Sequence, residues 1–320
     1  MTEFNNEWLR RVPDVPSEPI DDAVYLDGLA RLDQRNQNQL AAVWYWTNRL
    51  GASLSSIDEY LQGTRFVTRI AAGFIEELDG AFGVIVYTES PQVERTREQS
   101  GERSRRRILI SVDGREFPVV IRDSTVERHW CTAPEVTAPS IARATCWVRS
   151  SARGYEGWLM PRHAVVPLAA IVNFSDGSSG QLLDHFGECI DSVVVSSTTP
   201  PGGTQTRACW PLVAGQPLLV TDSPHSHQPV TVIDADLNLG VLRSVVFPIR
   251  FSTDWVGQPG NSGALIVDPS QSEPAGSYLG VLHPSVLGYV PPGMSAAPSS
   301  SGYAQSCYQL EAAAGLEFIL

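Results

Sequence analysis

A serine stands between small residues in the stretch Gln258-Pro-Gly-Asn-Ser-Gly263, directly before an apolar run. Ser262 therefore sits on a tight turn, where neighbouring amides can point into one spot and stabilise a developing oxyanion. Gly260 has no Cβ to block a close approach to the backbone, and Gly263 lets the chain turn into the next strand. The same short pattern occurs in ordinary turns, so Ser262 is a candidate nucleophile only if a base and an acid can join it.

The base must be a histidine that the fold can hold at a fixed angle. His163 ends the stretch Gly157-Trp-Leu-Met-Pro-Arg-His163, between one β-like run and the next. Four further histidines lie in polar or turn-like surroundings that are typical of surface positions: His129, His185, His225 and His227. His163 is therefore the candidate base.

The acid that orients the imidazole must itself be held away from water. Asp191 heads an apolar run, where a carboxylate can be buried beside an imidazole and fix its tautomer. Asp176 and Asp184 lie in Gly/Ser-rich or polar surroundings, where solvent would weaken such a contact. The predicted catalytic set is thus His163, Asp191 and Ser262.

These residues lie in a part of the chain whose pattern predicts many short strands. From residue 141 onwards, β-like runs are separated by glycine, proline and serine, which is typical of an antiparallel sandwich or barrel. The expected strands are 145–148, 157–159, 165–174, 190–195, 218–220, 230–233, 239–246, 265–267 and 278–282. After Tyr303 we expect a C-terminal helix that Gly315 ends, and then a last strand over 316–320.

The first part of the chain predicts a different structure. Apolar spacing over 21–50 predicts a helix that Gly51 ends, and 53–61 predicts a second, short helix. Two hairpins follow, with strands 66–75 and 82–87 joined across Asp79-Gly80, and strands 108–112 and 117–121 joined across Asp113-Gly114. Helices followed by a small sheet indicate an α+β unit.

Composition along the chain suggests the domain boundaries. Residues 89–107 are densely charged and almost free of apolar side chains, so we expect a surface loop there. Residues 131–139 contain two prolines among mixed polar residues and are the best linker. The predicted organisation is an N-terminal α+β accessory or regulatory domain over 1–130, that linker, and a mainly β domain over 140–320.

Overall composition limits the class of protein. With 320 residues, 26 Gly and 23 Pro, the chain is a turn-rich globular protein, and its net charge of -12 argues against binding nucleic acid. No stretch approaches the ~18 uncharged apolar residues of a membrane span, and the N-terminus has no signal-peptide core, so we expect a cytoplasmic protein. The five cysteines lack metal-type spacing and predict free, mostly buried thiols, with a Cys131–Cys146 bridge as the alternative in an exported protein. Neither a metal nor a cofactor is expected.

The order His163, Asp191, Ser262, with Gly-Asn-Ser-Gly around the serine and Ala-Val after the histidine, resembles the chymotrypsin-fold serine peptidases, particularly bacterial trypsin-like ones. The resemblance extends over about residues 137–320. It implies two six-stranded antiparallel β-barrels, a mainly β fold, and an oxyanion hole formed by the amides of Gly260 and Ser262. The stretch Leu279-Gly-Val-Leu-His283 is similar to the strand that lines the primary specificity pocket.

The chain departs from that family at three points. Met160-Pro-Arg precedes His163, where the family usually has Thr-Ala or Ser-Ala. The separation of 28 residues between His163 and Asp191 is short and implies trimmed loops in the first barrel. Asn261 replaces the usual aspartate before the serine, which fits a chain that is active without a zymogen cut.

The resemblance implies a serine endopeptidase that acts on a protein or peptide, with the N-terminal domain recruiting substrate, binding a regulatory partner or gating the cleft. Val256 would lie at the base of the specificity pocket, so an apolar pocket is the default. His283 would instead fit cleavage after Glu, and a shifted Asp254 would fit cleavage after Arg. Two other classes stay open: a catalytically silent peptide-binding scaffold and a small-ester hydrolase.

Overall fold

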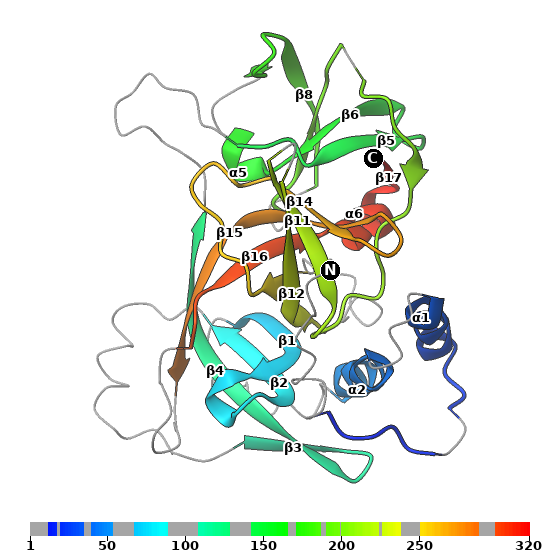
Figure 1. Ribbon diagram of the computed structural model, residues 1–320, viewed down its shortest axis with the longest axis vertical. Coiled ribbons are helices and arrows are strands. Elements are labelled where there is room, and N and C mark those ends of the chain that lie inside the picture. Colours follow the sequence, from blue (N-terminus) through cyan, green and yellow to red (C-terminus); the bar gives the residue numbers. More distant parts are fainter. Residues whose placement is uncertain are drawn as a thin grey trace.

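The computed structural model describes residues 12–17, 20–34, 40–53, 67–88, 108–128, 142–165, 171–186, 190–198, 200–223, 226–237, 250–287 and 298–320. Its fold is mainly β, as the sequence predicts. Two sheets make up most of it, and Figure 1 shows the smaller sheet at one end of the molecule and the helices α1 and α2 beside the other end.

The larger sheet has ten strands, in the order β11-β14-β15-β16-β13-β12-β1-β2-β4-β3. In chain order these are β1 (Val67–Ile75), β2 (Ala81–Thr88), β3 (Ile108–Val112), β4 (Arg115–Arg128), β11 (Pro217–Ser223), β12 (Ser226–Asp236), β13 (Arg250–Thr253), β14 (Leu265–Asp268), β15 (Glu273–Leu287) and β16 (Ser301–Ser306). Because β11 also pairs with β12, the pairings of β11, β14, β15, β16, β13 and β12 return to the first strand.

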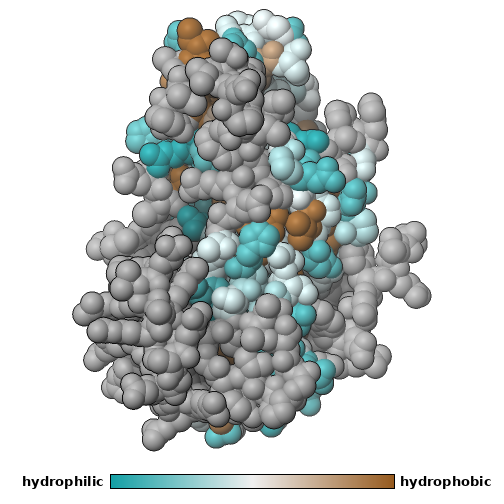
Figure 2. All heavy atoms as spheres, turned by 90° about the vertical axis from the view of Figure 1, so that its left-hand side faces the viewer, coloured by the Kyte–Doolittle hydropathy of each residue, from teal (hydrophilic) through white to brown (hydrophobic). Residues whose placement is uncertain are grey.

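The smaller sheet has seven strands, in the order β10-β17-β5-β6-β9-β8-β7. They are β5 (Cys146–Ser150), β6 (Tyr155–Met160), β7 (Ile171–Asn173), β8 (Ser179–His185), β9 (Val193–Val195), β10 (Gln205–Thr206) and β17 (Glu317–Ile319). Because the strands form one sheet of ten and one of seven, the arrangement in two barrels of six strands each remains a prediction. Figure 2 shows hydrophobic residues at the end of the molecule to which β7 and β8 belong, and these strands expose Ile171 and Leu183.

The N-terminal helices differ from the single helix predicted over 21–50. The described residues form two helices, α1 (Ala23–Gln34) and α2 (Ala41–Ala52), so the prediction of one helix was wrong. Asp22 caps α1, because its carboxylate accepts the backbone amides of Val24 and Tyr25. Each helix turns one face to the same core, so the apolar spacing continues from one helix to the next. For this reason the spacing alone does not show that there are two helices. The short helix predicted over 53–61 lies almost wholly outside the described residues.

Both predicted hairpins are present. Asp79 and Gly80 adopt φ of 57° and 72° and join β1 to β2, after a 3₁₀ turn over Glu76–Leu78. Asp113 and Gly114 adopt φ of 49° and 73° and join β3 to β4. These left-handed values favour Asp and Gly over bulkier residues. However, β4 runs seven residues beyond the predicted end at 121, because that extension pairs with β15.

The N-terminal strands belong to the same sheet as the later strands. On one side β1 pairs antiparallel with β12, and on the other β4 pairs antiparallel with β15. Two buried ion-pair groups lie at this junction: Arg69 with Asp234 and Asp236, and Arg122 with Glu77. We call these five residues the junction cluster. The predicted loop 89–107, the linker 131–139 and the strand 239–246 lie outside the described residues, so the domain boundary stays a prediction.

The later elements follow the sequence closely at the C-terminus. Helix α6 (Cys307–Ala314) ends at Gly315, whose φ is 61°, and β17 follows it, as predicted. Cys146, Cys209 and Cys307 are buried and form no disulfide among the described residues, whereas Cys131 lies outside them. Among the described helices, none is long and apolar enough to cross a membrane.

Candidate active site

The turn that carries Ser262 is shaped by its two glycines. Gly260 and Gly263 adopt φ of 92° and 91°, values that a residue with a Cβ rarely takes. A Cβ on Gly263 would also lie 1.9 Å from the carbonyl oxygen of Arg143. Asn261 closes the turn, because its Oδ1 accepts the amide of Gln258 at 2.7 Å and its own amide donates to the Gln258 carbonyl at 2.9 Å. The sequence folds this way because only glycine fits on both sides of Asn261-Ser262.

His163 lies in the short helix α5 (Arg162–Val165), which directly follows β6. The prediction placed it between two strands, and the structure has a helical turn there instead. This turn is anchored to the residue that the imidazole faces. The amide of His163 donates to Asp191 Oδ1 at 2.9 Å, and the amide of Arg162 donates to the Asp191 carbonyl at 3.2 Å. Asp191 itself lies two residues before β9 rather than within the strand.

The structure brings the three predicted residues together. His163 Nδ1 lies 2.8 Å from Asp191 Oδ2, and His163 Nε2 lies 3.1 Å from Ser262 Oγ. The residues are 28 and 99 positions apart for these two contacts, so the fold and not local sequence unites them. Because the carboxylate can only accept, Nδ1 carries the proton towards Asp191 and leaves the Nε2 lone pair for the serine.

All three side chains are held away from solvent. The side chains of His163 and Asp191 are 2% and 11% exposed, and Ser262 is buried. In such surroundings the carboxylate acts on the imidazole with little solvent screening. The Ser262 hydroxyl also has a second acceptor, the carbonyl of Leu279 on β15, at 2.8 Å. This contact was missed from the sequence, since a backbone carbonyl leaves no residue-type signal.

The backbone around Ser262 offers two amides to a ligand. The amides of Asn261 and Gly263 are used within the fold, by the carbonyls of Gln258 and Tyr278. Within the described residues, the amides of Gly260 and Ser262 have no backbone acceptor. These are the two donors that the sequence predicts for an oxyanion hole. Among the described residues, these two amides are therefore available as donors, as such a hole requires.

The residues predicted for the specificity pocket have different surroundings. Val256 is 43% exposed, and His283 is an exposed residue on β15 whose Nδ1 lies 2.8 Å from Ser300 Oγ. The carboxylate of Asp254 accepts the amide of Thr231 at 2.7 Å, so it faces β12. Its proposed return to the pocket would break this bond.

Two aromatic rings beside Val256 were not singled out from the sequence. Trp255 and Tyr278 pack edge to face with ring centroids 4.8 Å apart, and the Tyr278 hydroxyl accepts the amide of Gly257 at 3.0 Å. A Cβ on Gly257 would lie 2.7 Å from Trp255, so glycine is needed for this packing. In the sequence, the one signal of this packing is Gly257, which stands between Val256 and the turn that carries Ser262.

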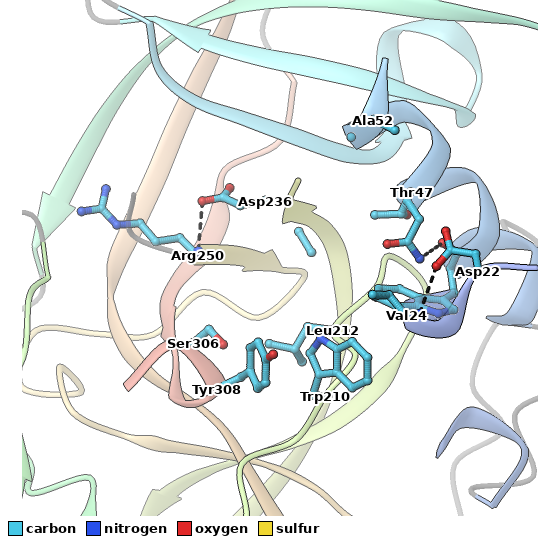
Figure 3. Close-up of a pocket in the computed structure, with 14 residues that line it drawn as sticks. Asp22, Val24, Thr47, Ala52, Trp210, Leu212, Asp236, Arg250, Ser306 and Tyr308 are labelled. Atoms are coloured by element: carbon cyan, nitrogen blue, oxygen red, sulfur yellow. Dashed lines mark hydrogen bonds between the residues drawn. The ribbon is translucent and has the colours of Figure 1, made fainter. Parts of the chain in front are cut away.

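The described residues also enclose a cavity that the predicted catalytic residues do not line. A cavity of about 230 Å³ lies between the helices α1 and α2 and the larger sheet, and its lining includes Trp44, Trp210, Leu212, Ser306 and Tyr308. Figure 3 shows Trp210 and Tyr308 on one side of it and α2 on another, with the Arg250 guanidinium pointing away. Within the described residues there is no group of three or more His, Cys, Asp or Glu that could hold a metal ion.

Comparison with known proteins gives similarity in structure alone. No protein family model and no curated protein matches this chain. Solved structures similar to part of it include the Nocardiopsis protease NAPase (13% identity, 56% of this chain and 91% of that chain, TM-score 0.36). A second is a glutamic acid specific serine protease, described as using a histidine triad in substrate binding (18% identity, 55% of this chain and 92% of that chain, TM-score 0.38). A third is Cellulomonas bogoriensis chymotrypsin (14% identity, 56% of this chain and 90% of that chain, TM-score 0.34). Because the identities and the TM-scores are low, the function of this chain must be argued from its own residues.

Proposed function

We propose that this protein is a serine endopeptidase whose nucleophile is Ser262. The observation that carries the proposal is the continuous chain of contacts from Asp191 through His163 to the serine hydroxyl. A serine hydroxyl is a weak nucleophile until a base removes its proton, and this arrangement supplies the base together with a carboxylate that orients it.

In the proposed reaction, Ser262 Oγ attacks the carbonyl carbon of the scissile peptide bond while its proton passes to His163 Nε2. Asp191 holds the imidazole by its Nδ1–H and stabilises the imidazolium that forms. The amides of Gly260 and Ser262 donate to the oxyanion of the tetrahedral intermediate. His163 then gives the proton to the leaving amine, which departs and leaves an acyl-enzyme. Water, activated by the same imidazole, hydrolyses the ester and restores Ser262.

The resting position of the serine hydroxyl fits this role. Its proton has two acceptors, His163 Nε2 at 3.1 Å and the Leu279 carbonyl at 2.8 Å. A rotation about the Cβ–Oγ bond moves the proton from the carbonyl to the imidazole without moving the oxygen. The nucleophile is therefore placed before substrate binds, and only its proton must be redirected.

We propose an apolar specificity pocket for this enzyme. Val256 is the predicted residue at its base, and the rings of Trp255 and Tyr278 lie beside it. The Asp254 carboxylate is held by the Thr231 amide, which argues against cleavage after Arg. The His283 imidazole is exposed and is held by Ser300 through Nδ1, so only its Nε2 remains for a Glu side chain in the alternative specificity.

A fluorophosphonate probe tests the nucleophile directly, because it reacts with an activated serine and needs no peptide substrate. We expect labelling of the wild type at Ser262, no labelling of Ser262→Ala, and a loss of peptide turnover in that variant of about a million-fold. Ser151→Ala is the matched control, since it removes one hydroxyl from an exposed turn. A proteome-derived peptide mixture is a suitable substrate because the cleaved sequence is unknown.

The two competing classes give different results in this experiment. A wild type that folds but is not labelled would be a catalytically silent, peptide-binding protein. A labelled enzyme that hydrolyses small acyl esters but no peptide would be an ester hydrolase. Either result contradicts the proposal. Equal thermal stability of Ser262→Ala and the wild type shows that any loss arises from chemistry and not from unfolding.

A further inference from the structure

The N-terminal strand β4 pairs with β15 immediately beside the candidate nucleophile. The carbonyl of Leu279 on β15 accepts the Ser262 hydroxyl, and the pairing with β4 begins at the next residue. The register is antiparallel, with Gly280 opposite Arg128, Val281 opposite Glu127 and Leu282 opposite Val126. Figure 1 shows β4 running alongside β15. The end of β4 is therefore directed towards Ser262.

An extended peptide substrate needs this same edge of β15. Its scissile carbonyl must reach Ser262 Oγ, and the nearest strand that can hold its backbone is the one whose Leu279 carbonyl contacts that oxygen. Peptides commonly bind by adding a strand to a free edge of a sheet, with main-chain hydrogen bonds supplying the affinity. On β15 the residues that follow Leu279 are already paired. Substrate and β4 therefore compete for one row of backbone groups.

Direction and spacing make β4 resemble a substrate. The chain runs from Val126 to Arg128 towards the nucleophile, which is the direction of the residues that precede a scissile bond held antiparallel to β15. Strands advance about 3.4 Å per residue, so a peptide bound in the register of β4 and one residue longer would lie opposite Leu279. The chain's own backbone thus occupies the line along which an external peptide would arrive.

The two halves of β4 are held differently. Residues 119–123 pair with β2 on one side, in parallel, and 121–123 pair with β15 on the other. This half also carries Arg122, whose guanidinium is buried against Glu77 at 2.6 Å. By contrast, residues 124–128 pair with β15 alone among the described strands. The end of β4 can therefore separate from β15 while its first half stays fixed.

We propose that residues 126–128 of β4 act as an intramolecular inhibitor that occupies the backbone-binding edge of β15 at Gly280–Leu282. The proposal rests on the serine endopeptidase function argued above. The catalytic residues are already assembled, and peptide binding requires the end of β4 to leave β15. When the competent form is a minor fraction, apparent affinity for the peptide falls by that fraction, and loosening the strand restores it.

Proline substitutions loosen the strand without touching β15 or the catalytic residues. Along an antiparallel strand, successive amides alternate between facing the partner and facing away. One of the two variants Val126→Pro and Glu127→Pro therefore removes an amide that donates to β15. We expect that variant to raise kcat/KM for a peptide with four or more residues before the cleaved bond by about tenfold. Glu127→Ala keeps the backbone amide and is the matched control, with an expected change of less than about twofold.

A disulfide across the pair gives the opposite perturbation. Thr125 and His283 are exposed and lie directly opposite each other, and the Cα separation of such pairs, about 4.5–5.5 Å, lies within the disulfide range. In the double variant Thr125→Cys/His283→Cys, we expect oxidation to lower kcat/KM for the long peptide about tenfold relative to the reduced form of the same protein. This comparison cancels any effect of losing His283. Wild type treated with the same oxidant and reductant controls for the native thiols.

The fluorophosphonate rate separates the two proposals, because this small probe does not need the edge of β15. We expect that rate to be unchanged in all strand variants. A normal labelling rate with peptide turnover that neither rises with proline nor falls on oxidation would overturn the inhibitor proposal and leave the peptidase intact. Absence of labelling in every form would remove both. If the proline variants fail to fold, the oxidised and reduced forms of the disulfide variant decide the question.

Discussion

Two regions of this protein bury ionisable side chains, and they do so with different results. In the active-site set, Asp191, His163 and Ser262 form one line of contacts that ends at a hydroxyl beside two amides without a backbone acceptor among the described residues. In the junction cluster, the side chains satisfy one another inside the sheet, with Arg122 donating to both carboxylate oxygens of Glu77. Burial alone therefore does not mark a reactive site; groups that remain available to a ligand do.

The same difference separates the effects expected from mutation. Removing the reactive group from a member of the active-site set should stop chemistry and largely spare the fold when the replacement keeps the size of the side chain and leaves no unpaired charge. Removing a member of the junction cluster should weaken the fold, because the partner charge is left inside the sheet.

After the loss expected for Ser262→Ala, the largest effect should be that of Asp191→Asn on catalysis. The amide would keep the shape of the side chain but would present a donor to His163 Nδ1, so the imidazole would turn its proton towards Ser262 and cease to be a base. We expect kcat to fall by about 10⁴ with little change in thermal stability. Measurement of kcat and the unfolding midpoint on one preparation checks both halves. A variant that loses stability in proportion to activity would show that Asp191 is structural.

The next largest effect should be that of Arg122→Met on stability. This change leaves the Glu77 carboxylate buried without its cation, and we expect the free energy of unfolding to fall by about 3–5 kcal/mol. Arg149→Met is the matched control, because the Arg149–Glu156 pair is 48% and 43% exposed and should contribute less than about 1 kcal/mol. Urea unfolding of the two variants measures the difference.

A double variant sharpens this test. Glu77→Leu/Arg122→Met replaces both charges by apolar groups, so no uncompensated carboxylate remains, and we expect it to regain most of the lost stability. A double variant as unstable as Arg122→Met would contradict the account, since the loss would then arise from packing and not from the unpaired charge.

Gly263→Ala should affect both properties, because this residue belongs to the fold and to the site. A Cβ would meet the Arg143 carbonyl at 1.9 Å and would also force an alanine into the left-handed region at φ 91°. We expect a loss of at least about 2 kcal/mol of stability together with most of the activity. Gly177→Ala is the matched control: its φ is 84°, but a Cβ there meets nothing within 4 Å. It should show the backbone strain alone.

Much of the site could be predicted from the sequence, because its residues have distinct types and flanks. The glycines around Ser262 predict a turn, and the position of Asp191 before an apolar strand predicts a carboxylate shielded from solvent. The carbonyl of Leu279 and the ring of Tyr278 could not be found in this way, since each contributes a backbone atom or an ordinary core side chain. Their role depends on strand pairing at long range.

The fold was harder to predict wherever a strand pairs with another that is distant in the sequence. The hairpins at Asp79-Gly80 and Asp113-Gly114 are local structures, and the residue types at their turns predict them. The extension of β4 to Arg128 has no such signal, because its residues apart from Val126 are polar and are held by pairing with β15. The break between α1 and α2 was missed for a related reason: both helices face one core, so the apolar spacing does not stop.

The smallest expected effect concerns pH and stability at Asp236, in the junction cluster. Burial raises the pKa of this carboxyl to about 6, against the opposing pull of the Arg69 guanidinium. In the unfolded chain the pKa of an aspartate is about 3.9, so between about pH 4 and 6 the folded state holds the proton more tightly. The contribution of Asp236 to stability is therefore largest below about pH 4 and falls as pH rises to 6. Asn cannot titrate, so the stability of the wild type minus that of Asp236→Asn should fall over this interval by about 2 kcal/mol. Urea unfolding of both proteins at pH 4, 5 and 6 measures this difference. A difference that is constant with pH, or that rises, would mean that the pairing with Arg69 outweighs burial at this carboxylate.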